Sequence, residues 1–388
     1  MLLLIVISNT TFYLFAAEYG PTGWHPAEGG PIDRAAQLIM IVGLDMRIFP
    51  LFAFLFGYGM MMVYLRQTRA GLEPGRAVAI LRRRSLWLIV FGFAHAALFM
   101  AGDILGAYGV MSLILGGFFI RRSERTLLIA AGVAVGLLIL LVLLSAMAFM
   151  AGEAPEPVRN CEVYAADLTD PVAAIGARLN TWLLVTVMGG LLGFSFHAAL
   201  LLGMWAARRG ILEEPARHLV LLTTVAAIGI PIGWLGGLPT ALGHLDLIDL
   251  PDELLVMTGL LYMVQNLTGM FGGLGYAALF TLLAHVLSEG LRRSVPVTMI
   301  TAMGKRALSS YLAFSVIFSP VLAAWGLGLG AHLTSATMVL FAIGVWLIVA
   351  AAFCALEQFD RRGPAEALLR RGMYGEKGTE GRRHGGMN

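Results

Sequence analysis

The sequence predicts an all-α protein, a polytopic transmembrane helical bundle with about ten spans. Its 388 residues are 58% hydrophobic and only 13% charged, whereas soluble domains carry about 25% charged residues. Of the 27 Lys and Arg residues, 23 lie in alternate gaps between long apolar runs. A soluble protein has no reason to alternate the charge of its loops with each apolar run, so this pattern indicates a chain that crosses a membrane repeatedly.

Each long apolar run is expected to form a helix. About 20 apolar residues cross the hydrocarbon core, and a segment in lipid must pair its own backbone polar groups. The first run is short and lacks the features of a signal peptide, so we expect the start of its helix to be missing. The eighth is too long for one straight helix, and its glycines indicate a bend or a close helix contact. In order, the runs are approximately 2–17, 37–65, 85–100, 104–120, 127–150, 180–206, 219–242, 256–288, 307–328 and 335–356.

The charges of the gaps predict the orientation, because short loops rich in Lys and Arg stay in the cytoplasm. Both termini are therefore expected in the cytoplasm. The pI near 9.0 reflects these basic loops, which face anionic lipid headgroups, so the bilayer is the expected partner and nucleic acid is not. The basic gaps are 66–84, 121–125, 208–217, 292–306 and 361–383, and the acidic gaps are 18–33, 153–170 and 246–253.

The chain is expected to form one transmembrane domain, residues 1–374, because no gap is long enough for a soluble domain. Residues 375–388 are too polar to fold alone and are expected to be a disordered cytoplasmic tail. The segment 153–178 is the longest outside connection. It is interpreted as a solvated loop, and a lid over an outward-facing site is the alternative.

Ionisable residues within the apolar runs are candidates for function, because a charge inside a bilayer is costly without a partner or water. Asp45 and Arg47 are two residues apart and point to different sides of a helix, so each needs another partner. His95 is expected to face the bundle interior, within hydrogen-bond reach of Asp103, Asp45 or Tyr108. One interpretation is a structural polar network. The other is a site open to the outer face, with a histidine as general base and Arg47 binding an anion.

Two further histidines are candidates. His25 lies in the first outside loop, and His197 lies in the sixth run at a depth comparable to that of His95. The chain contains no P-loop, HExxH or CxxC motif, so no metal cofactor is expected.

Five short blocks form a series along the chain: RIFPLFAFLFGYG (47–59), RRR with GFAH and GDILGAY (82–108), LGMWAARRG (202–210), GKRALSSY (304–311) and GPAE (363–366). In this order they resemble the motifs of a bacterial membrane family known as domain of unknown function 418, or YeiB-like. That family opens with a helix of the form LDxLRGFALLGILLxN. Residues 2–9 match only the end of this helix, which supports a truncated start.

The resemblance implies a function. The family is regarded as a distant relative of membrane acyltransferases that modify extracytoplasmic sugars. This implies the bacterial inner (plasma) membrane, an acyl-coenzyme A donor, and a sugar or lipid acceptor at the outer face. In those relatives an outer histidine before a helix carries the transfer. His25 occupies that place, whereas His95 lies in the block typical of this family.

Roles follow for an acyltransferase-like enzyme. His95 or His25 would act as the base with Asp103 orienting a histidine, and Arg47, Asp45, Tyr108 and His197 would contact the substrate. The alternatives are a transporter, in which the same charges line a substrate or proton path, and a non-catalytic membrane scaffold. Binding of an acyl donor would favour the enzyme, and a flux driven by pH would favour the transporter.

Overall fold

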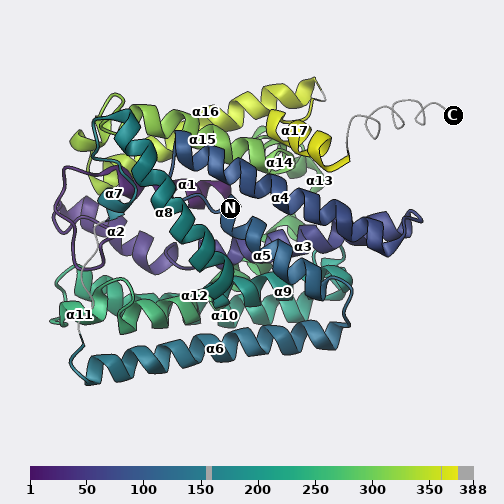
Figure 1. Ribbon diagram of the computed structural model, residues 1–388, viewed down its shortest axis with the longest axis horizontal. Helices are drawn as coiled ribbons and strands as arrows, with labels where there is room; N and C mark the ends of the chain where they lie inside the picture. The colour runs from purple at the N-terminus through teal and green to yellow at the C-terminus, as the bar shows by residue number, and fades with distance from the viewer. Residues whose placement is uncertain (154–159, 360, 375–388) are drawn as a thin grey trace.

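The computed structural model describes residues 1–153, 160–359 and 361–374, and these residues form helices and no β-strand (Figure 1). The predicted all-helical class is confirmed. The predicted tail, residues 375–388, lies outside the described residues. The helices are α1 (Leu2–Thr10), η1 (Thr11–Tyr13), α2 (Pro31–Gly43), α3 (Ile48–Arg69), α4 (Pro74–Leu98), α5 (Leu105–Phe119), α6 (Glu124–Met150), α7 (Asn160–Val163), α8 (Pro171–Leu192), α9 (Phe194–Arg208), η2 (Pro215–Arg217), α10 (Leu219–His244), α11 (Asp252–Leu255), α12 (Leu260–Val286), α13 (Glu289–Arg292), α14 (Val295–Lys305), α15 (Ala307–Leu322), η3 (Leu329–His332), α16 (Ser335–Gln358) and α17 (Pro364–Tyr374).

Six stretches are long and apolar enough to cross a membrane, namely α3, α6, α8, α10, the stretch Asp252–Val286 and α16. Three shorter apolar helices, Leu2–Tyr13, α5 and α15, accompany them. Several of these helices begin at a side-chain cap. Ser123 accepts a hydrogen bond from the backbone N–H of Thr126 at the start of α6, and Asp170 accepts one from Val172 at the start of α8. Such caps satisfy backbone donors that the helix itself leaves unpaired.

Two of the predicted runs are broken in the structure. Run 37–65 is divided into α2 and α3 by residues 44–47, where Met46 has a φ of 60°. Run 180–206 is divided into α8 and α9 at Gly193. Hydropathy averaged over a run does not reveal either break, because the apolar pattern continues on both sides of Asp45 and Arg47 and of Gly193.

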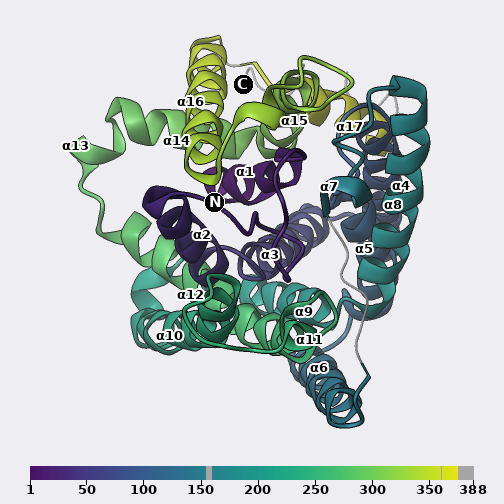
Figure 2. The ribbon, with the colours of Figure 1, turned by 90° about the vertical axis from the view of Figure 1, so that its left-hand side faces the viewer.

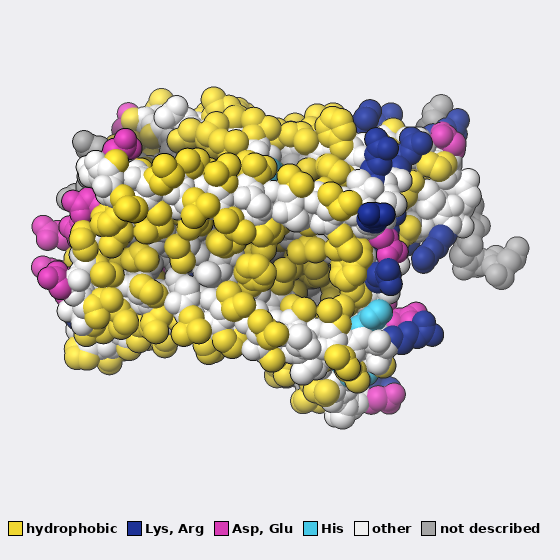
Figure 3. Space-filling view, turned by 90° about the horizontal axis from the view of Figure 1, so that it is seen from below, with side chains coloured by type: hydrophobic (Ala, Val, Ile, Leu, Met, Phe, Trp, Pro, Cys, Tyr) yellow, Lys and Arg dark blue, Asp and Glu magenta, His cyan; other side chains and the backbone are white. Residues whose placement is uncertain are grey.

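The two ends of the molecule carry opposite charge. Figure 3 shows a broad apolar belt with Asp and Glu at one end, while Lys and Arg gather at the other together with some Asp and Glu. Comparison with Figure 1 locates α7 and α11 at the acidic end, and α13 and α17 at the basic end. The alternating loop charges of the sequence are thus sorted to opposite ends by the fold.

The helices pack in layers around α1, α2 and α3. In both ribbon views α14, α15 and α16 lie on one side of these helices, α9, α10 and α12 lie on the other, and α6 is outermost (Figures 1 and 2). One apolar cluster joins α3 to α9 and α12, and a second joins α1 to α15 and α16. α2 contacts both α10 and α16, so it connects the two sides.

Glycines allow α10, α12 and the start of α3 to approach closely. A side chain at Gly233 would meet the backbone of Gly272, and one at Gly273 would meet the backbone of Arg47. Small residues at such contacts let helix backbones approach within a membrane. Of the two expectations for run 256–288, the close contact is present, while α12 continues unbroken through its glycines.

Candidate functional site

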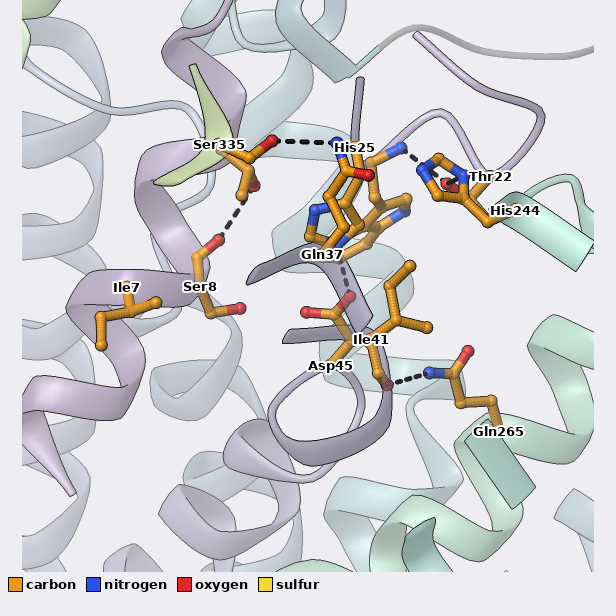
Figure 4. A network of polar contacts seen from close by, with 12 residues as sticks. Ile7, Ser8, Thr22, His25, Gln37, Ile41, Asp45, His244, Gln265 and Ser335 are labelled. Carbon is orange, nitrogen blue, oxygen red and sulfur yellow. Dashed lines mark hydrogen bonds and ion pairs between the residues drawn. The ribbon is translucent and has the colours of Figure 1, made fainter. Parts of the chain in front are cut away.

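A buried hydrogen-bonded pair, His25 and Asp45, joins the first loop to the break between α2 and α3. His25 Nε2 lies 2.7 Å from Asp45 Oδ2, and the two residues are 1% and 6% exposed (Figure 4). A carboxylate only accepts hydrogen bonds, so Nε2 carries the proton that is shared with Asp45. The other ring nitrogen, Nδ1, has no hydrogen-bond partner among the described residues. In the neutral ring this nitrogen is a free acceptor, which is what a general base requires.

The loop that carries His25 is held by two side chains on different helices. The carbonyl of Pro26 accepts a hydrogen bond from Gln37 Nε2 of α2 at 3.0 Å and one from His244 Nε2 of α10 at 3.1 Å. Because a carbonyl cannot donate, Nε2 of His244 carries its proton. Its Nδ1 therefore accepts from the hydroxyl of Thr22, at 3.1 Å. These contacts fix the loop that carries His25 with respect to α2 and α10.

The break between α2 and α3 directs Asp45 toward His25. The backbone N–H of Asp45 still bonds to the carbonyl of Met40, but Met46 adopts the left-handed conformation, which is unfavourable for a residue with a side chain. Gln265 of α12 donates to the carbonyl of Ile41 at 3.0 Å and supports the C-terminal end of α2. Backbone strain of this kind persists only where the surrounding structure enforces it, and it is frequent at functional sites.

Arg47 is fully buried and its guanidinium is engaged by backbone carbonyls. Nη1 donates to the carbonyls of Ile41 and Asp45, and Nη2 donates to the carbonyl of Gly233. The side chain passes between α10 and α12, where side chains at Gly237 and Gly272 would collide with it. It is not one of the residues that line the cavities beside His25.

Two adjoining cavities lie beside the His25–Asp45 pair. The smaller, which we call the chamber, has a volume of about 20 Å³, enough for about one water molecule. Its walls include His25, Asp45 and Leu255 of α11, so it lies toward the acidic end. The larger, which we call the groove, has a volume of about 420 Å³ and is lined mainly by apolar and aromatic side chains. Trp24, Met46 and Tyr262 line both cavities.

Three of the polar groups that line the chamber lack partners among the described residues. They are Nδ1 of His25, Nε1 of Trp24 and the hydroxyl of Thr240. A buried polar group without a hydrogen bond costs about 1–3 kcal/mol. One base and two donors around a water-sized space are therefore suited to a bound polar group.

His95 and Asp103 form a second buried pair. His95 Nδ1 lies 2.9 Å from Asp103 Oδ1, which confirms the expected hydrogen bond and the inward orientation of the histidine. The carboxylate of Asp103 also accepts from the backbone N–H of Gly106 at 2.9 Å and from Trp182 Nε1 at 3.3 Å. This network ties together α4, α5 and α8. Neither residue of the pair lines the chamber or the groove.

The other predicted residues have separate positions. Tyr108 lines the groove and donates its hydroxyl to the carbonyl of Phe49 at 2.9 Å, which joins α5 to α3. His197 Nε2 bonds to the carbonyl of Gly190 at 2.9 Å, across the break between α8 and α9. The structure therefore does not collect the predicted residues in one site. It pairs His25 with Asp45 beside the two cavities and leaves the His95–Asp103 pair and His197 apart from them.

Sequence reasoning missed several residues around the chamber, among them Thr22, Trp24, Gln37, His244 and Gln265. His244 had a usable signal, because it is a histidine at the end of an apolar run next to an acidic gap. The neutral residues carried no such signal. In the part of the chain that the structure describes, no group of three or more His, Cys, Asp or Glu residues is arranged to hold a metal ion. Burial raises the pKa of Tyr164, another residue of the groove, so its hydroxyl stays protonated.

The apolar belt, the spanning helices and the buried polar site define a helical membrane protein. Residues 206–376 match the model of the family described as protein of unknown function (DUF418). The chain is 28% identical to the uncharacterised protein YeiB of Escherichia coli over 380 residues, which cover 95% of this chain and 91% of YeiB. It is 25% identical to the uncharacterised protein YxaH of Bacillus subtilis over 366 residues, covering 88% and 83% of the two chains. The chain is thus similar to the DUF418 family over residues 206–376 and to the YeiB and YxaH proteins over most of its length. No solved structure matches the chain.

Proposed function

We propose that the protein is an acyltransferase that moves an acyl group from an acyl thioester, such as acyl-coenzyme A, to a hydroxyl at the outer face of the membrane. The observation that carries the proposal is the chamber, where the unpaired Nδ1 of the His25–Asp45 pair stands with two unpaired donors. Acyl transfer to a hydroxyl needs one base for the hydroxyl proton and donors for the charge that develops on the carbonyl oxygen.

In the proposed reaction His25 Nδ1 takes the proton of the acceptor hydroxyl, and the hydroxyl oxygen forms a bond to the acyl carbonyl carbon. The Nε1–H of Trp24 and the hydroxyl of Thr240 are the donors available to the developing oxyanion. The carbon–sulfur bond of the thioester then breaks, and the leaving thiolate takes the proton back from His25. Asp45 holds the Nε2–H and stabilises the charged ring in the interval.

The proposal gives different roles to the other polar residues. Arg47, whose Nη donors bond to carbonyls, positions the break that carries Asp45 and does not bind the oxyanion itself. His95 and Asp103 position the ends of α4 and α5.

The test is turnover of a radiolabelled acetyl-coenzyme A by the purified protein in nanodiscs made from bacterial lipid. We expect release of coenzyme A and transfer of label to a membrane component. His25→Gln keeps a hydrogen-bonding side chain but removes the base, and should lower the rate by about 10²- to 10⁴-fold without changing thermal stability.

The matched control is His332→Gln, since His332 is an exposed histidine of η3. It should turn over like the parent. Unchanged turnover by His25→Gln would rule out His25 as the base. A parent that consumes no acyl donor yet carries a flux driven by pH would favour the transporter.

A further inference from the structure

The groove opens sideways between helices. Leu184 and Met188 of α8 line it, and they are 59% and 42% exposed. α8 is one of the six stretches able to span a membrane, and both residues lie well inside it. Exposed apolar side chains at such positions face lipid. Figure 2, viewed from the acidic end, shows α8 at one edge of the molecule, away from α11 and α12.

The walls of the groove change in character along its length. Where α8, α5 and α9 meet, the lining is mainly apolar, with Ala107, Val185 and Phe196. Asn266 of α12, which accepts a hydrogen bond from Ser195 of α9, adds one polar group there. Toward the loops of the acidic end, polar residues such as Asn9 and Thr181 join the lining. An apolar site with a few polar groups at one end suits an amphiphile whose chain and polar headgroup lie in a fixed order.

The polar end of the groove adjoins the chamber through Trp24, Met46 and Tyr262. The lining of the two cavities, as far as the chain is described, includes no Lys or Arg, and Asp45 is its one carboxylate. A phosphate group is normally paired with Arg or Lys, and the carboxylate of Asp45 would repel it. The lining therefore favours an uncharged headgroup that offers hydroxyls.

We propose that the groove takes an alkyl chain of a neutral membrane lipid with a hydroxylated headgroup, which enters from the bilayer past Leu184 and Met188 and presents a hydroxyl to His25. Its volume of about 420 Å³ is within the range of about 300–1,000 Å³ that is common for small-molecule sites. The role of that hydroxyl as the acyl acceptor rests on the proposed function. Binding of the lipid in the groove does not.

The experiment uses photolabelling in nanodiscs, without any acyl donor. The probe is a diacylglycerol with a diazirine in one acyl chain, compared with a phosphatidylglycerol that carries the same chains, and labelled residues are mapped by mass spectrometry. We expect labelling of groove residues such as Val185 and Phe196, about tenfold stronger with the diacylglycerol.

A variant that fills the groove separates binding from the lipid that surrounds any membrane protein. Val185→Trp should lower groove labelling about tenfold, while Leu183→Trp should not, because Leu183 is exposed on the same helix and does not line the groove. If Val185→Trp does not fold, Gly189→Val serves instead, since a side chain there meets Ala107 at an ordinary contact distance of 3.5 Å.

The outcomes distinguish this inference from the proposed function. Labelling confined to residues such as Leu183, equal labelling by both probes, or no effect of filling the groove would overturn the lipid site and leave acyl transfer untouched. Groove labelling that persists in His25→Gln supports the lipid site. If the parent binds the probe but transfers no acyl group, the site stands and the enzymatic role fails.

Discussion

His25 and His95 form the same kind of pair through different ring nitrogens. His25 uses Nε2 toward Asp45, whereas His95 uses Nδ1 toward Asp103. The nitrogen that remains has a different setting in each case. His25 lines the chamber, whereas the ring of His95 packs against that of Tyr311, with 5.2 Å between the ring centroids. The same His–Asp hydrogen bond thus lies beside a cavity in one pair and among packed helices in the other.

The candidate site was only partly predictable at the scale of single residues. The cost of a charge in lipid singles out Asp45, Arg47, His95 and Asp103 from the sequence alone. The His95–Asp103 bond could be expected because Gly102 lets the chain turn back between them. The His25–Asp45 bond could not, since it depends on the course of a loop that has no periodic pattern. The hydrogen bonds from Arg47 to three backbone carbonyls were equally unpredictable, because every residue has a backbone carbonyl and the sequence does not show which ones accept.

Replacement of Arg47 tests the burial of this guanidinium. Arg47→Ala removes a donor from three backbone carbonyls, of which, among the described residues, only that of Ile41 keeps a side-chain bond, from Gln265, and it opens a cavity between α10 and α12. We expect a loss of about 3–5 kcal/mol in the free energy of unfolding. Thermal or denaturant unfolding in detergent measures it, with Leu183→Ala as the control that faces lipid. A loss no larger than that of the control would mean that Arg47 is solvated.

At the scale of helices, hydropathy predicted where apolar segments lie and failed to predict where they break. α2 and α3 were expected to be one helix because the apolar run 37–65 continues on both sides of Asp45 and Arg47. The break follows from tertiary contacts instead, namely the three carbonyls that Arg47 binds and the support of α2 by Gln265. It is also what brings Asp45 to His25. The functional geometry therefore depends on the feature that the apolar pattern conceals.

A pair of glycine substitutions tests the close packing of α10, α12 and α3. A side chain at Gly272 would press against Arg47 and the backbone of Gly233, while Gly344 of α16 has open space around it. We expect Gly272→Ala to destabilise the protein by about 1–3 kcal/mol through overpacking. Gly344→Ala should be neutral or stabilise it by up to about 1 kcal/mol, because alanine is the better helix former. Unfolding in detergent compares the two, and equal effects would contradict the close contact.

At the scale of the whole molecule, charge organises the protein along the membrane normal. Basic side chains gather at one end of the apolar belt and the other end is acidic (Figure 3). The lining of the chamber, which includes Leu255 of α11, locates it toward the acidic end. This arrangement was predictable, because loop charge and segment order together assign each loop to one end. The number of membrane crossings was harder to predict from the sequence. Some predicted runs form a helix that is too short to span, such as α1, and another is divided into a helix long enough to span, α8, and a shorter one, α9.

The charge arrangement predicts that the basic end faces the cytoplasm. We expect a cysteine at Leu247, which is 59% exposed in the acidic gap after α10, to react with an impermeant maleimide added to intact cells. A cysteine at Ala70, exposed in the basic gap after α3, should react only after lysis. Both belong in a chain whose Cys161 and Cys354 are replaced by alanine, so that no other thiol contributes. Reaction at position 70 in intact cells, with none at 247, would reverse the orientation. The chamber would then face the cytoplasm, and an outer-face acceptor would no longer fit the site.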